Sequence, residues 1–203
     1  AQELINKVKS KCCGIKDYED CYADMARWMG MNPAEKKDIA WNASSKRFMQ
    51  GWYDKVLRPM ERDGIDFWWL DWQQWDNDKE FPRLSNVWWI NYTTFTDMER
   101  HHDTRPMLYH RWGGLGNHRY QIGFSGDAII SWKSLDFQPY YNSTASNVLY
   151  GYWSHDIGGH MGADSINPEM YIRWMQFGAF SPILRTHSTK NAGLNKEPCV
   201  FAD

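Results

Sequence analysis

Two aspartates occupy positions from which they could act as a catalytic pair. Asp71 closes the apolar run 65–70, and Asp127 follows the turn-forming residues 124–126. Cleavage of a glycosidic bond needs two carboxyl groups, because one attacks the sugar or activates water while the other protonates the leaving oxygen. A partly dry aromatic pocket would raise the pKa of one carboxyl and keep it protonated at neutral pH. Taken singly, each position is equally typical of a solvated strand-end turn.

The supply of tryptophan supports a sugar site. The chain has 13 Trp among 203 residues, and 16% of its residues are aromatic. Flat aromatic faces suit the C–H faces of pyranose rings, although Trp is also a large core residue. Next to paired carboxylates, this abundance favours carbohydrate binding.

The elements that would position these carboxylates alternate between strands and helices. Each predicted strand is a short apolar run that ends in a polar side chain, which is typical of a parallel α/β barrel with its chemistry at the C-terminal strand ends. An open doubly wound sheet is the competing architecture, but its G-x-G-x-x-G turn is absent. The predicted strands are 65–71, 105–111, 120–127, 150–156 and 182–187. The predicted helices are the end of one at 1–10, then 17–31, 44–63, 84–102, 132–149 and 168–177.

A complete barrel has eight strands and about 250 residues. The predicted strands therefore correspond to roughly strands 4 to 8 of a (β/α)8 TIM barrel, an α/β fold. We expect residues 1–203 to form part of one catalytic barrel, with its N-terminal strands and flanking β-domains outside this sequence.

Local signals set several helix boundaries. Ser44 or Ser45 can cap the helix that Gly64 ends, and Pro168 suits the first turn of the last helix. Pro139 weakens the helix prediction for 132–149. Trp174, Phe177 and Phe180 recur at helical spacing and are expected in the core.

The charge pattern narrows the class of partner. The net charge is −2 and the basic residues are scattered among acids, so we expect no nucleic-acid interface. No apolar stretch of about 18 residues exists, so no membrane span is expected. Four cysteines, Cys12, Cys13, Cys21 and Cys199, fit no zinc pattern. Three N-glycosylation sequons, at Asn42, Asn91 and Asn142, favour a secreted, periplasmic or secretory-pathway location over others, although the compartment stays open.

Several segments resemble glycoside hydrolase family 31, the α-glucosidase and α-xylosidase family, in the family's order over residues 64–188. Residues 66–72 are similar to its nucleophile strand, and Gly126-Asp127, followed by Trp132 and Leu135, to its acid/base segment. Residues 155–159 resemble its Asp-Ile-Gly-Gly element. Residues 173–182 resemble its Arg-Trp-x-Gln-x-Gly-x-Phe-x-Pro signature, and 185–187 its Arg-x-His.

The resemblance implies a role for each matching residue. Asp71 would be the nucleophile and Asp127 the general acid and then base. Arg111 would contact substrate hydroxyls and the acid/base side, while Asp156 and His187 would hydrogen-bond ring hydroxyls. Trp69 would form part of the wall of that subsite. The resemblance implies neither a metal nor an organic cofactor.

Three departures leave the sugar more open than the chemistry. Trp72-Gln73-Gln74 stands where the family often has Met-Asn-Glu. Phe124 replaces a usual Trp three positions before the acid/base, and His160 replaces an aromatic residue after the paired glycines. We include Trp72 and Phe124 among the expected substrate-binding residues.

The expected function is hydrolysis of a terminal α-linked sugar, an α-glucoside first, with retention through a covalent glycosyl-enzyme. The partner is then an oligosaccharide or glycoside, and the oligomeric state is open. Retention predicts carboxyl groups about 5–6 Å apart. We also expect Arg111, Asp156 and His187 to converge on the pocket of Asp71.

Alternative functions remain open at this point. An α-transglycosylase shares the first half-reaction, and Trp72 with Trp75 could form its acceptor platform. A non-catalytic carbohydrate-binding protein could use the same fold. A metallohydrolase could draw ligands from 101–103, 155–156 and His160, although the sequence has no ligand motif of known geometry.

Overall fold

The computed structural model describes residues 14–71, 77–78, 80–111, 114–197 and 199. Within them the chain divides into two compact units, Ala1–Leu108 and Tyr109–Asp203, which are described separately. The helix end predicted at 1–10 and the residues Trp72 and Trp75 lie outside the described residues.

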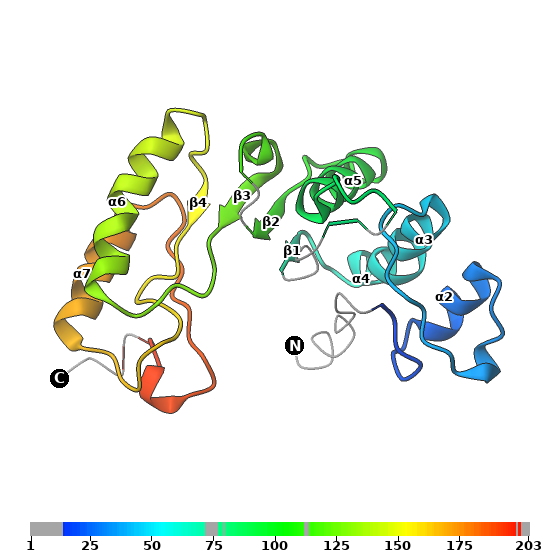
Figure 1. Cartoon of the computed structure of the whole chain (residues 1–203), viewed down its shortest axis with the longest axis horizontal. Helices are drawn as coiled ribbons and strands as arrows, with labels where there is room; N and C mark the ends of the chain where they lie inside the picture. Colours follow the sequence, from blue (N-terminus) through cyan, green and yellow to red (C-terminus); the bar gives the residue numbers. More distant parts are fainter. Residues whose placement is uncertain (1–13, 72–76, 79, 112–113, 198, 200–203) are drawn as a thin grey trace. The chain divides into compact units, whose positions relative to one another are not determined.

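The first unit is mainly helical (Figure 1). Helix α2 covers Tyr22–Met29, and a 3-10 turn, η1, covers Pro33–Glu35. A continuous helical segment follows, made of α3 (Lys46–Gly51), the π-helical stretch η2 (Trp52–Leu57) and α4 (Arg58–Arg62).

The ends of this long helical segment match the sequence prediction. The Ser45 side chain accepts a hydrogen bond from the Phe48 amide and caps the first turn. Gly64, at φ 110°, follows the last turn. The π-helical stretch was not predicted. It lies just before Pro59, which has no N–H to donate to the preceding turn.

Strand β1 (Trp68–Leu70) and helix α5 (Asn86–His101) complete the first unit. Trp68 and Leu70 are buried while Trp69 between them is 50% exposed. The nearly continuous apolar run at 65–70 predicts a strand buried on both faces, as parallel strands are, and this is wrong for β1, because its side chains alternate between a packed face and an open one.

Three neighbouring strands follow in the order β2 (Leu108–Arg111), β3 (Gln121–Phe124) and β4 (Trp153–Ser154), and all of their residues except Leu108 belong to the second unit. Strands β3 and β4 are parallel, with Phe124 opposite Ser154. The predicted fifth strand is not a continuous strand, but it makes parallel bridges from Ile183 to Ser154 and from Thr186 to Ile157. It therefore runs alongside β4 and the segment that follows it.

Helices follow the strands of this unit. Helix α6 (Trp132–Ser146) contains Pro139, and α7 (Pro168–Ala179) is capped by Asn167, which accepts from the Met170 amide. Short 3-10 turns, η3 (Asn117–Tyr120) and η4 (Ala192–Leu194), precede β3 and follow α7. None of the described helices has the length and apolar character needed to cross a membrane.

Helix α7 supplies much of the core of the second unit. The core cluster consists of Ile130, Ile157, Ile166, Met170, Tyr171, Trp174 and Leu194. Trp174 is fully buried and Phe177 packs against the cluster, as predicted. Phe180 is 93% exposed, so its predicted core position is wrong. The helix ends at Ala179, so Phe180 no longer follows the helical periodicity.

Two of the three sequons lie in helices. Asn91 is fully buried within α5, so the structure does not present it as a glycosylation site. Asn142 lies in α6 and contacts the ring of His155. The burial of Asn91 and the contact of Asn142 with His155 remove two of the three sequons as support for a secretory location.

Candidate active site

Asp127 lies on a strained turn just after β3. Gly126 has φ 64° and Asp127 has φ 52°, both in the left-handed region. Asp tolerates this region better than most residues, and such conformations gather at functional sites because surrounding contacts must hold them.

The side chain that holds this carboxylate comes from the neighbouring strand. Arg111, the last residue of β2, is 4% exposed, and its guanidinium donates a 2.9 Å hydrogen bond to Asp127 Oδ2. A Cβ at Gly126 would lie 2.9 Å from Arg111 Cζ, so glycine there permits the approach. The ring of Phe124 lies 5.8 Å from the same guanidinium. A charge-assisted hydrogen bond of this kind fixes the orientation of the carboxylate.

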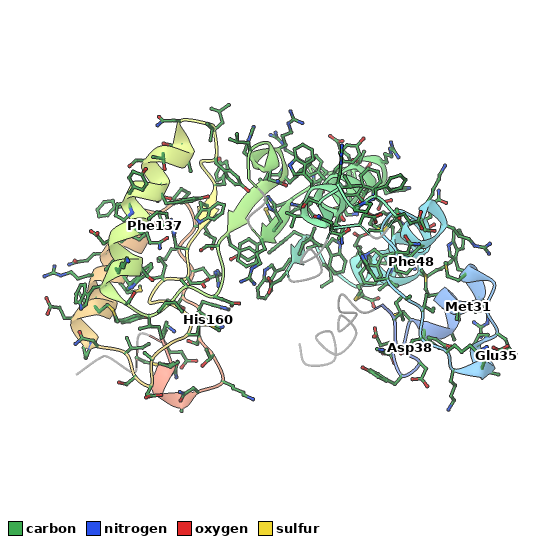
Figure 2. The ribbon with its side chains drawn as sticks, in the orientation of Figure 1. Met31, Glu35, Asp38, Phe48, Phe137 and His160 are labelled. Atoms are coloured by element: carbon green, nitrogen blue, oxygen red, sulfur yellow. The ribbon has the colours of Figure 1, made fainter. Side chains whose placement is uncertain are left out.

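Two histidines lie on the other side of Asp127. His160 Nε2 is 3.4 Å from Asp127 Oδ1. The rings of His160 and His187 stack, with centroids 4.1 Å apart and planes 23° apart. Burial lowers the pKa of His187, and the nearby Asp156 carboxylate only partly opposes this effect. Figure 2 marks His160 on the loop that follows β4, whereas Phe137 lies on α6.

Asp156 connects the acid/base turn to the last bridging segment. Its Oδ2 accepts a 3.0 Å hydrogen bond from the Ala128 amide, and its Oδ1 accepts one from Arg185. Arg185 also donates to Ser154 Oγ at 3.1 Å and lies over the ring of Tyr109. Asp156 is 1% exposed, so in this structure it orients its neighbours, and direct contact with a sugar stays a prediction.

Two further buried groups flank Asp156. Burial lowers the pKa of Lys196 to about 8, and its ammonium donates to the Leu194 carbonyl at 3.3 Å. Burial likewise lowers the pKa of His155 to about 4. The ring of His155 lies 2.7 Å from Gln138 Oε1 and 2.9 Å from Asn142 Oδ1. His155 therefore packs against α6 through these two side chains, next to Asp156 in sequence.

The predicted site residues of the second unit come together. Arg111, Phe124, Asp127 and His187 lie around one turn, and Asp156 supports that turn. Trp69 and Asp71 belong to the first unit, so the spacing of the two carboxyl groups and their convergence stay predictions.

The sequence analysis did not anticipate the contacts of His160, Arg185 and Lys196. In the sequence, His160 stood out as a departure from the family pattern and as a possible ligand of the metallohydrolase alternative. Arg185 belongs to the segment 185–187 that resembles the family's Arg-x-His element, but the sequence analysis assigned it no role. The sequence feature connected with Lys196 is the pair Gly158-Gly159. A Cβ at Gly158 would lie 2.6 Å from Lys196 Cδ, so glycine there leaves room for the lysine side chain.

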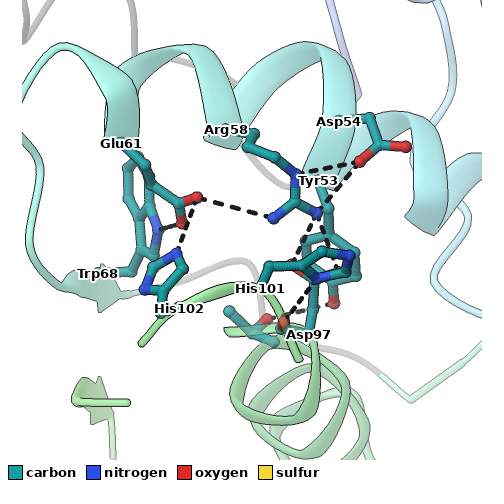
Figure 3. A network of polar contacts seen from close by, with 9 residues as sticks. Tyr53, Asp54, Arg58, Glu61, Trp68, Asp97, His101 and His102 are labelled. Carbon is teal, nitrogen blue, oxygen red and sulfur yellow. Dashed lines mark hydrogen bonds and ion pairs between the residues drawn. The ribbon is translucent and has the colours of Figure 1, made fainter. Parts of the chain in front are cut away.

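The histidines that a metallohydrolase would need in the first unit have other contacts (Figure 3). His102 Nε2 lies 3.1 Å from Glu61 Oε2, and His101 Nδ1 lies 2.8 Å from the Asp97 carbonyl. Arg58 contacts the carboxylate of Asp97 at 3.1 Å and that of Glu61 at 3.9 Å. In the second unit, Asp127, His160 and His187 bring their ligand atoms within 4.8 Å of one another. That set shares only His160 with the residues the sequence suggested for a metal.

Comparison with known proteins identifies the class. The chain matches the TIM-barrel domain of glycosyl hydrolases family 31 over residues 3–203. Neutral alpha-glucosidase C of Homo sapiens is 32% identical over 101 residues, which are 49% of this chain and 10% of that protein. The alpha-xylosidase of Saccharolobus solfataricus is 27% identical over 192 residues, which are 82% of this chain and 24% of that protein. The chain thus spans about a tenth to a quarter of the length of these relatives.

Solved structures show the same fold. A xylosidase from Aspergillus niger superposes with a TM-score of 0.68 and 16% identity, covering 94% of this chain and 35% of that one. The chain therefore belongs to glycosyl hydrolase family 31. Its α/β fold is that of the family's TIM barrel, as the sequence predicted.

Proposed function

We propose that this chain carries the catalytic pair of a retaining α-glycosidase that acts on terminal α-linked sugars. The observation that carries the proposal is the Arg111–Asp127 pair. It places an oriented carboxylate beyond β3, at the C-terminal strand end where barrel enzymes keep their chemistry.

The proposed reaction is a double displacement. Asp71 attacks the anomeric carbon and forms an ester while the glycosidic bond breaks and Asp127 gives its proton to the leaving oxygen. Asp127 then takes a proton from water, the water oxygen bonds to the anomeric carbon, and the ester breaks to release Asp71. Two inversions at one carbon give net retention.

The proposed substrate is an α-glucoside, with an α-xyloside next and an α-galactoside, plain or N-acetylated, after these. The support is that relatives are an alpha-glucosidase, such as that of Bacillus thermoamyloliquefaciens, and an alpha-xylosidase. His160 stacks on His187 beside Asp127, and it stands where the family more often has an aromatic residue, so we expect His160 to affect sugar choice.

The test is release of nitrophenol from a panel of aryl α-glycosides by the protein, with Asp71→Asn and Asp127→Asn alongside. Asp136→Asn, an exposed carboxylate on α6, is the matched control. We expect turnover of one glycoside that Asp71→Asn abolishes and the control retains. NMR of the first-formed sugar should show the α-anomer.

Two results would overturn the proposal. A β-anomer as first product would mean inversion. A folded protein that binds sugars but turns none over would favour the carbohydrate-binding alternative. Products longer than the substrate would instead identify the transglycosylase.

A further inference from the structure

We propose that Asp127, His160 and His187 form a binding site for a divalent transition-metal ion of the Zn²⁺ class, which inhibits the enzyme when it binds. The inhibition rests on the proposed function, whereas the binding does not. The three ligand atoms lie within 4.8 Å of one another on loops of one unit.

The spacing suits zinc after a small adjustment. With bonds of about 2.1 Å, tetrahedral ligand atoms lie about 3.4 Å apart. His160 Nε2 and Asp127 Oδ1 are already 3.4 Å apart. The third ligand, His187, stacks beside His160, and its ligand atom lies within 4.8 Å of the other two, so it has to move closer to complete the set.

The ligand chemistry selects the type of ion. Two imidazoles and one carboxylate suit Zn²⁺ and Cu²⁺, while Mg²⁺ and Ca²⁺ prefer oxygen ligands. His160 Nδ1 has no hydrogen-bond partner in the described part of the chain, so Nε2, which lies 3.4 Å from Asp127 Oδ1, is the nitrogen that would bind the ion.

Nearby charges set a limit on affinity. Arg111 occupies Asp127 Oδ2, which leaves Oδ1 as the metal ligand. The guanidiniums of Arg111 and Arg185 repel a dication, while Asp127 and Asp156 attract it. We therefore expect reversible binding by three protein ligands, with water in the open fourth position.

The consequence follows from the role of Asp127. A carboxylate oxygen bound to a metal ion cannot carry the proton that the leaving group needs. The ion would also occupy the space beside His187 that the resemblance assigns to sugar hydroxyls. Zn²⁺ should therefore inhibit, and a chelator should restore or raise activity, which is the opposite of what a catalytic metal would give.

The experiment is calorimetric titration of the chelator-treated protein with Zn²⁺, and with Mg²⁺ as a negative control. We expect about one Zn²⁺ per chain, and His160→Gln should weaken binding by roughly 10-fold or more, because loss of a ligand exceeds the usual effect of losing a supporting contact. His101→Gln, an exposed histidine of the first unit, is the matched control and should bind as the parent does. Circular dichroism checks that both variants fold.

The outcomes separate this proposal from the proposed function. Absence of Zn²⁺ binding, or equal affinity in folded His160→Gln, overturns the metal site whatever the activity. Binding that depends on His160 in a protein without glycosidase activity upholds the site and refutes only the inhibitory role. Loss of activity when a chelator is added would overturn the proposal that the bound ion inhibits the enzyme.

Discussion

Arg111 Nη2 lies 2.9 Å from Asp127 Oδ2, and this hydrogen bond joins the last residue of β2 to the turn that follows the neighbouring strand β3. The two residues are sixteen positions apart in sequence. Their contact depends on the absence of a side chain at Gly126, whose Cβ would lie 2.9 Å from Arg111 Cζ. The orientation of the proposed acid/base therefore depends on a glycine that does no chemistry.

The first prediction concerns Gly126. Gly126→Ala should lower kcat/KM by roughly 10- to 100-fold, because a displacement of about 1 Å in a catalytic group can cost that much. The added Cβ meets the guanidinium, and φ 64° is strained for alanine. Steady-state kinetics with the best aryl glycoside measures the effect.

Gly151→Ala is the matched control. A Cβ at Gly151 would meet no atom within 4 Å, so this variant should keep normal kinetics. Equal kinetics for both variants would show that Arg111 does not need the space at Gly126.

The second prediction concerns the Arg185–Asp156 pair. Arg185→Met should lower the free energy of unfolding by about 3 kcal/mol, because removing one partner leaves a buried charge uncompensated. Asp156 has no exposed side-chain surface. Urea denaturation followed by tryptophan fluorescence measures the change.

Arg173→Met provides the comparison for that pair. Arg173 lies 3.7 Å from Glu169 on the surface of α7, with more than half of each side chain exposed. Exposed pairs contribute about 0–1 kcal/mol. A similar loss in both variants would mean that burial of Asp156 is not the cause.

The third prediction concerns acid stability and His155. Its pKa is about 4 in the folded chain, below the ordinary value of 6.5, so the unfolded chain binds the proton more readily between these values. The free energy of unfolding should therefore fall by up to about 3 kcal/mol as pH drops from 6.5 to 4.

His155→Asn isolates this effect. The pH dependence of the parent minus that of the variant should show the fall, since other titrating groups cancel in the difference. Parallel curves between pH 6.5 and 4 would mean that His155 titrates normally in the folded chain.

The fourth prediction concerns Lys196 at high pH. Its folded pKa of about 8 lies below the ordinary 10.5, so the folded state favours the neutral amine. Stability should rise with pH from about 8 to 10.5 relative to Lys196→Met, which has no titrating group there. Thermal unfolding of both proteins across this range tests it, and a constant difference would contradict the lowered pKa.

Much of the local structure could be predicted because its causes are local. Ser45 caps the helix it was expected to cap, and Pro168 opens the last helix. Strands were found where short apolar runs ended in polar groups. Two predictions failed because exposure depends on the packing of the whole fold. Asn91 was a predicted glycosylation site but is buried within α5, and Phe180 was a predicted core residue but is exposed just past the end of α7.

By itself the sequence determined the family, the α/β alternation and the identity of the candidate catalytic residues, because these reside in residue type and short spacing. Only the tertiary structure decided which side chains surround Asp127. The stacking of His160 on His187 depends on two loops meeting, and the engagement of Asp156 depends on Arg185 and the Ala128 amide. Such contacts join residues 16 to 29 positions apart, and no local propensity encodes them.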